Sequence, residues 1–388
     1  MSGVPPQEAD AGPWAGQDSL PVVRDDEANS QALASHRDSF LDLLRAVSIC
    51  RVVLLHTLLR PPVVYLPWVM WIYPGMPEVF FVSGAVTAQM LHRRPARQVI
   101  ARRFRRIALP YAFYAVSALS VMAVTDARSS APGATLPIST LWHWFIPLLA
   151  PIGSKDRVFL WGQLWYVGAF LLLVLASPLL FRAERRVGAA IALVPFTGFV
   201  FCLWLTKKHN VRVDETIITA CQFGVFFALG PSYEHLRMWS WRKLVALSGV
   251  FGAAGIVTAL AIEPIRDKGT QELYSSRSAH LLIGAAWMLL ALSAQTPVRR
   301  WIASHAGAVR GVVGRINQRT FTMYLWGLPA NGVGNAASRK VGGASGNLLV
   351  YLLVSALTFT AFVLLFGWIE DVAAQRRRRL IPPASEFA

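Results

Sequence analysis

The feature of this sequence that most restricts its fold is a series of apolar runs, each close to 20 residues long. An α-helix rises 1.5 Å per residue, so about 20 residues cross a hydrocarbon core about 30 Å thick. Only 15% of the 388 residues are charged, too few to cover a water-soluble globule, and the mean hydropathy is +0.44. We therefore expect a polytopic integral membrane protein of the all-α class.

The apolar runs predict about ten transmembrane helices. A further segment, Leu141 to Pro151, holds two tryptophans and two prolines but is too short to cross a bilayer, so we expect it to be interfacial or re-entrant. The predicted spans are 39–59, 70–91, 107–125, 161–181, 187–206, 215–231, 241–262, 278–296, 318–336 and 346–369.

The basic residues between the apolar runs predict the orientation. With the N-terminus inside, the inner connections hold about twice as many arginines and lysines as the outer ones. Cytoplasmic loops carry such an excess, so we expect both termini inside and a multi-pass protein of the plasma membrane. A net charge of +17 in a soluble protein would suggest nucleic acid. Here the charge is spread over loops, and we expect no nucleic-acid partner.

The chain divides into three parts by composition. Residues 1–37 are polar and rich in Asp, Glu, Pro and Gly, which predicts a disordered cytoplasmic tail. Residues 38–370 form the predicted transmembrane domain, and residues 371–388 form a basic cytoplasmic tail anchored at the membrane face. The three cysteines lack the spacing of a metal site, so we expect no metal and assign them to packing: Cys50, Cys202 and Cys221.

The first predicted span carries the strongest candidates for chemistry, Arg45 and His56. They are eleven positions apart. On an α-helix this spacing places the two side chains within about 20° of each other around the axis and about 16 Å apart along it. Ionisable residues inside a bilayer are costly and usually functional. A structural interpretation remains open for each, because His56 could be a hydrogen-bonded core residue and Arg45 could reach the headgroups.

The second predicted span contains Glu78, Ser83 and Gly84. A carboxylate inside an apolar run needs a partner, and we expect Glu78 to lie at a depth similar to that of His56. Ser83 and Gly84 permit close approach of two helix backbones. Packing of the Ser-Gly pair and a loop position for Glu78 are the competing interpretations.

The next inner connection is denser in arginine than topology requires. It contains Arg102, Arg103, Arg105 and Arg106. Guanidinium groups bind phosphates through paired hydrogen bonds, and an acyl-CoA donor presents a pyrophosphate and a ribose phosphate. Binding of anionic membrane lipids is the alternative.

At these residues the chain resembles the acyltransferase-3 family of membrane O-acyltransferases. Asp42, Arg45 and His56 match the motifs of that family's first helix, and Val79 to Gly84 approximate its Phe-Phe-x-x-Ser-Gly motif. Three further segments are similar: Arg102 to Tyr111, Gly162 to Leu180, and Tyr324 to Gly327, where Gly327 replaces a histidine of the family pattern. The resemblance covers roughly residues 39 to 370.

The resemblance implies an enzyme that transfers acyl groups other than aminoacyl groups. The donor would be cytoplasmic acyl-CoA, and the acceptor a hydroxyl of a sugar or glycosylated molecule. We expect acyl-CoA, such as acetyl-CoA, as a co-substrate and no permanently bound cofactor. His56 would act as general base or acyl relay, with Arg45 as donor or oxyanion contact and Glu78 as a third catalytic residue. The expected substrate or acyl-CoA contacts are Asp42, Ser83, Gly84, Arg102, Arg103, Arg105 and Arg106.

A transporter or flippase of a polar solute is the alternative function. Buried charges would then line a path, and no bond would form or break. Release of free thiol from acetyl-CoA distinguishes the two functions.

Overall fold

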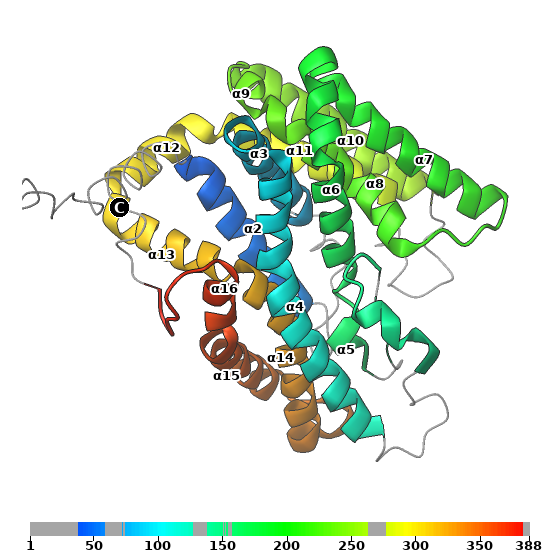
Figure 1. Ribbon diagram of the computed structural model, residues 1–388, viewed down its shortest axis with the longest axis vertical. Coiled ribbons are helices and arrows are strands. Elements are labelled where there is room, and N and C mark those ends of the chain that lie inside the picture. The colour runs from blue at the N-terminus through cyan, green and yellow to red at the C-terminus, as the bar shows by residue number, and fades with distance from the viewer. Residues whose placement is uncertain are drawn as a thin grey trace, which may run out of the picture.

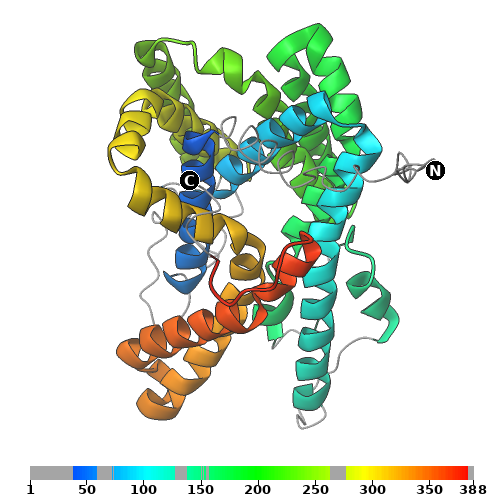
Figure 2. The same ribbon diagram turned by 60° about the vertical axis from the view of Figure 1, so that its left-hand side comes forward.

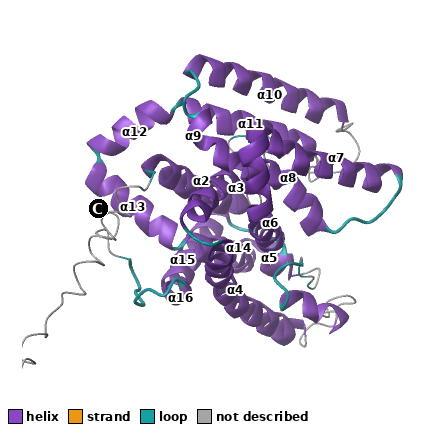
Figure 3. Ribbon diagram, turned by 45° about the horizontal axis from the view of Figure 1, so that its top comes forward, coloured by secondary structure: helices purple, strands orange, loops and turns teal. Residues whose placement is uncertain are grey.

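The computed structural model describes residues 38–58, 72, 74–126, 138–149, 151, 153, 157–262 and 277–382. Every regular element within these residues is a helix (Figure 3). The predicted all-α class is therefore confirmed for the described part of the chain. The predicted tail at residues 1–37 and parts of the predicted outer loops lie outside the described residues.

Within the described residues, ten long helices occupy the ranges where apolar runs predict spans. They are α2 (Ser39–Leu58), α3 (Met76–Arg93), α4 (Ala96–Asp126), α6 (Trp165–Val187), α7 (Leu193–Lys208), α8 (Glu215–Leu229), α10 (Trp241–Ile262), α11 (Arg277–Ser293), α14 (Thr320–Gly342) and α15 (Leu348–Phe366). The shorter α-helices are α5 (Val158–Trp161), α9 (Tyr233–Leu236), α12 (Gln295–Ser304), α13 (Ala306–Gln318) and α16 (Trp368–Ala373). Short 3-10 helices are η2 (Ile138–Trp144), η4 (Gly188–Ala192), η5 (Gly230–Ser232) and η7 (Gly343–Ser345).

Fewer segments than the ten predicted spans are both long enough and apolar enough to cross a membrane by themselves. Among the described residues there are five: 96–125, 158–208, 215–236, 241–261 and 348–373. A sixth is added if α11 and α12, bent by 54°, form one broken span. The segment 158–208 contains two predicted spans, now helices α6 and α7. Helices α2, α3 and α14 are less apolar because they carry polar residues, several of which line the candidate site.

Helices α2 and α3 lie between two groups of helices (Figures 1 and 2). Helices α6, α7, α8, α10 and α11 form the group drawn in green to yellow at the upper right of Figure 1. Helices α14 and α15 pack side by side in the second group, and α14 also contacts α2. The long helix α4 contacts α3, α6, α14 and α16. A cavity next to α2 and α4 can therefore receive side chains from both groups.

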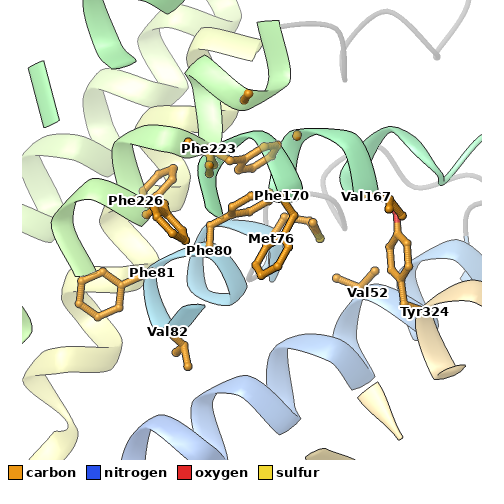
Figure 4. Close-up of a cluster of buried hydrophobic side chains, with 14 of the residues drawn as sticks. Val52, Met76, Phe80, Phe81, Val82, Val167, Phe170, Phe223, Phe226 and Tyr324 are labelled. Atoms are coloured by element: carbon orange, nitrogen blue, oxygen red, sulfur yellow. The ribbon is translucent and has the colours of Figure 1, made fainter. Parts of the chain in front are cut away.

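Aromatic side chains join α3 to the first group. The Phe80 ring stacks on Phe223 with centroids 5.0 Å apart, and Phe223 stacks on Trp165 at 5.7 Å. Figure 4 shows Phe80, Phe170, Phe223 and Phe226 meeting where α3, α6 and α8 converge. Such offset ring pairs contribute roughly 0.5 to 1.5 kcal/mol beyond the buried area. This cluster fixes the position of α3 and of the candidate residues on it.

Two local expectations need correction. Helix α3 begins at Met76 and not at residue 70. Gly75 has φ of +83°, which an α-helix does not allow, so a helix cannot continue through this residue. The arginine-rich connection is also not a loop, since α4 is helical from Ala96. Arginine and alanine are good helix formers, and Pro95 immediately precedes the first turn.

Candidate acyl-donor and catalytic site

A cavity with a volume of about 600 Å³ lies beside the N-terminal half of α2. Cavities of this size are typical of small-molecule sites. Its walls come from α2, α3, α4, the end of α13 and residues 374–376, which follow α16. Six arginines line it, against two aspartates: Arg45, Arg102, Arg103, Arg105, Arg106 and Arg376, with Asp38 and Asp42. The cavity is therefore suited to a polyanionic ligand.

The helical start of α4 explains how four arginines reach one cavity. Positions 102, 103, 105 and 106 span little more than one turn of α4, so their long side chains can all reach the same cavity. Arg105 also donates from Nε to the backbone oxygen of Ala373 at 3.1 Å. The structure thus brings together the four arginines that the sequence suggested as donor contacts, together with Arg45 and Asp42.

Among the four α4 arginines, Arg103 differs in having buried donors that pair with no group in the described residues. Its Nε and Nη2 atoms are buried without a hydrogen-bond partner. Leaving a buried charged donor unsatisfied is costly, and a carboxylate or phosphate removes that cost through paired hydrogen bonds. A bound anion in the cavity would satisfy these donors.

A smaller cavity of about 60 Å³ continues the site along α2. It shares Arg45, Arg103 and Arg106 with the larger cavity and adds Ile49, one turn further along the helix. The remaining walls include Ser83, Tyr166, Tyr324 and Glu370. The two cavities together extend from the beginning of α2 to its middle.

Glu370 is a buried acidic residue of the smaller cavity. Its carboxylate accepts a hydrogen bond from the backbone N–H of Thr322 at 2.5 Å, which joins α16 to the first turn of α14. The Tyr324 hydroxyl, two residues further along α14, donates to the backbone oxygen of Gln163. The Gln163 side chain donates in turn to the hydroxyl of Tyr114 at 3.0 Å. This buried network fixes the wall opposite α2.

Helix α2 also carries His56, at its far end. One continuous helix holds Arg45 and His56, so the eleven-residue spacing gives a rise of about 16 Å on nearly the same face. His56 is half-buried. Its neighbour Thr57 donates to Asn331 Oδ1 at 3.1 Å, and the Tyr351 hydroxyl donates to the Thr57 carbonyl at 2.8 Å. The His56 end of α2 therefore packs against α14 and α15.

Gly327 lies on α14 close to this end. A Cβ there would be in ordinary contact with Val53 at 3.5 Å, and Val53 precedes His56 by one turn. The histidine that the family pattern has at this position would therefore stand near His56. The chain lacks that side chain and carries Asn331 one turn later on α14.

The structure does not join Glu78 to His56 by a hydrogen bond. Both carboxylate oxygens of Glu78 are buried without a hydrogen-bond partner, although the backbone N–H groups of Gly75 and Glu78 lie near them. Gly75 packs against Ser48 and Val52, and α3 then runs back along α2. Glu78 is thus level with the middle of α2, roughly 10 Å short of His56 along the helix axis.

Ser83 and Gly84 face different neighbours. Ser83 lines the smaller cavity. A Cβ at Gly84 would overlap the backbone carbonyl of Phe227, and a Cβ at Gly230, at the end of α8, would overlap the backbone of Gly84. Gly84 is thus at a close contact between α3 and the end of α8, as expected for small residues between membrane helices. Asp42 lines the large cavity, and its backbone oxygen accepts from Asn317 Nδ2 at 2.8 Å.

Several lining residues were not predicted from the sequence. Asn317, Gln318, Tyr166, Glu370 and Arg376 reach the cavities from distant parts of the chain. The arginine run at 376–379 was visible, but its composition indicated only a tail. Nothing in the local sequence shows that this segment folds back. In the described residues no group of three or more His, Cys, Asp or Glu side chains is placed to hold a metal ion.

Fold and site together define an all-helical membrane protein with a cationic cavity that extends along one polar helix. Comparison with protein families specifies this class further. A family model described as an acyltransferase domain, of the acyltransferase-3 type, matches residues 38–367. The chain belongs to the acyltransferase-3 family. No curated protein and no solved structure matches it significantly.

Proposed function

We propose that the protein is a membrane-bound O-acyltransferase that uses cytoplasmic acyl-CoA. Family membership indicates acyl transfer as the chemistry. The observation that supports this donor is the cavity of about 600 Å³ lined by six arginines, one of which has buried, unpaired donors. Phosphates of coenzyme A would satisfy these donors, and the acyl thioester would extend past Ile49 along α2 to the His56 end.

The proposed reaction uses the far end of α2. The neutral imidazole of His56 accepts the proton of an acceptor hydroxyl, and the hydroxyl oxygen attacks the thioester carbonyl carbon. The carbon–sulfur bond then breaks, and the leaving thiolate of coenzyme A takes the proton from the imidazolium. Arg45 neutralises charge on the donor or on the developing oxyanion. An acyl group carried transiently on His56 would give the same products.

The proposed acceptor is a hydroxyl of a sugar or of a glycosylated molecule, and acetyl is the proposed acyl group. This rests on family membership, for which O-acetylation is typical. With both termini in the cytoplasm of a plasma-membrane protein, the arginine-lined cavity would open to the cytoplasm. His56 would lie nearer the outer face, where a surface glycan is within reach. The donor and the acceptor would thus approach α2 from opposite sides.

Sealed membrane vesicles test this proposal. Inside-out vesicles that contain the protein and a surface-glycan fraction receive labelled acetyl-CoA, and both free thiol and label in the glycan are measured. We expect thiol release and labelled glycan in inside-out vesicles and neither in right-side-out vesicles. The matched control is His56→Gln in vesicles of the same orientation.

Two outcomes would contradict the proposal. Equal activity in both vesicle orientations would reject a cytoplasmic donor. Movement of a polar solute across the membrane without thiol release in inside-out vesicles would favour the transporter alternative.

A further inference from the structure

The chain folds back on itself after α16, beyond the residues that the family model matches. We call residues 374–382 the C-terminal strap. Two side chains hold it: Arg319, between α13 and α14, donates from Nη2 to the Arg379 carbonyl at 2.6 Å, and Arg315 of α13 donates from Nε to the Pro382 carbonyl at 3.2 Å. The contact of Arg105 with Ala373 fixes its beginning. The strap is thus part of the folded domain.

Asp371 is the anchor of the strap. Its carboxylate forms an ion pair with Arg319 at 2.7 Å, and both side chains are at most 4% exposed. Asp371 also accepts from the backbone N–H of Arg376, through its carbonyl oxygen at 2.7 Å, and from that of Arg379, through Oδ2 at 3.3 Å. Between Asp371 and Arg376, Gln375 has φ of +58°, so the chain reverses sharply there. This reversal places Arg376 in the wall of the large cavity.

The guanidinium of Arg376 has unused hydrogen-bonding capacity. Its Nε and Nη2 atoms are buried without a hydrogen-bond partner. Nη2 lies 3.7 Å from Asp371 Oδ1, too far for a hydrogen bond, and Asp371 is already paired with Arg319 at a shorter distance. Arg103 lines the same cavity from α4 with the same two atoms unpaired. Two guanidinium groups from separate elements therefore present buried donors to one cavity.

We propose that Arg376 binds a phosphate of the acyl-CoA donor and that the C-terminal strap completes the donor site. This inference rests on the proposed function. A structural role for Arg376 is the less economical explanation, because Arg319 already compensates the charge of Asp371. A phosphate seated between Arg103 and Arg376 would satisfy all four buried nitrogen atoms at once.

Equilibrium binding of labelled coenzyme A tests the proposal on the full chain in phosphatidylcholine nanodiscs. Arg376→Gln removes the charge and the fork of donors, and Arg377→Gln is the matched control because Arg377 is exposed. We expect Arg376→Gln to raise Kd about tenfold or more and Arg377→Gln to leave it within about twofold. Arg376→Lys keeps the charge without the fork, so its Kd should lie between.

Thermal midpoints of the same preparations separate binding from folding. The proposal predicts an unchanged midpoint for Arg376→Lys together with weaker binding. It is overturned if Arg376→Gln and Arg376→Lys bind coenzyme A like the wild type, or if they only lower the midpoint. It is also overturned if Arg376→Gln changes only the retention of phosphatidylglycerol added to the nanodiscs. Failure of the wild type to bind coenzyme A would instead reject the proposed donor itself, together with this inference.

Discussion

The two ends of helix α2 have opposite surroundings. The Arg45 end borders a cavity of about 600 Å³ with six arginines in its walls. The His56 end packs against α14 and α15, with Thr57 bonded to Asn331 and Tyr351. One helix thus connects a region suited to binding a large anion with a compact region suited to positioning one titratable group. This difference supports our proposal that donor binding and chemistry are separated along α2.

The largest expected effect is at the compact end. His56→Gln keeps a hydrogen-bonding side chain of similar size but cannot accept a proton at neutral pH. We expect acyl transfer to fall roughly a hundredfold to ten-thousandfold, as is typical when a general base is removed. Turnover should be measured together with the thermal midpoint of the same preparation. Near-normal turnover of the Gln variant would make His56 a positioning or core residue.

The next largest effect concerns the framework around the anion-binding end. Arg319→Met removes the nearer charge partner of buried Asp371 and leaves only Arg376 at 3.7 Å; breaking a buried pair typically costs about 3 to 5 kcal/mol of stability. Reversible unfolding in detergent measures the loss, and Arg310→Met is the control because Arg310 is exposed on α13. Equal stability of the two variants would mean that the Arg319–Asp371 pair does not hold the strap.

A smaller effect is expected for the anion contacts themselves. Arg103→Gln and Arg106→Gln should each raise the apparent KM for acyl-CoA, by the roughly 1.5 to 3 kcal/mol of a charged hydrogen bond. Turnover at saturating donor should change much less. The kinetic comparison uses Arg97→Gln as control, because Arg97 is exposed and outside this cavity. An unchanged KM in inserted protein would assign the arginines to lipid binding or topology.

The smallest effects distinguish two glycines. Gly327→Ala adds a methyl group in ordinary contact with Val53 on α2, so we expect stabilisation of about 0.5 to 1 kcal/mol from helix propensity. Gly84→Ala forces a methyl group onto the backbone of Phe227, and we expect a loss of about 1 to 3 kcal/mol. Thermal unfolding compares the pair. Stabilisation by Gly84→Ala would show that α3 and α8 are not in close contact.

Helix positions were largely predictable from hydrophobicity. The run at 241–262 coincides with α10, and the run at 215–231 with α8 to within two residues. Helix α3 was placed too early because periodicity alone does not register the positive φ of Gly75. The amphipathic helices α12 and α13 occupy a connection between two predicted spans, where the sequence predicts no helix, since arginines between apolar runs indicate topology as readily as structure.

The candidate site was predictable in part. Arg45 and the arginines of α4 reach one cavity because each group lies on a single helix, where spacing determines direction. Arg376 and Glu370 were not predictable, since long-range folding of the segment after α15 brings them to the cavities. Gly84 was expected as a substrate contact, yet it packs against α8. Gly84 directly follows Ser83, and a step of one residue turns the side-chain direction by about 100° around a helix.

Equilibrium binding of coenzyme A to three proteins in nanodiscs tests the separation along α2 most directly. The proteins are the wild type, His56→Gln and Arg103→Gln. Our account predicts that His56→Gln binds coenzyme A within about twofold of the wild type, while Arg103→Gln binds about tenfold or more weakly. Equal loss of binding in both variants, or full binding by Arg103→Gln, would contradict it.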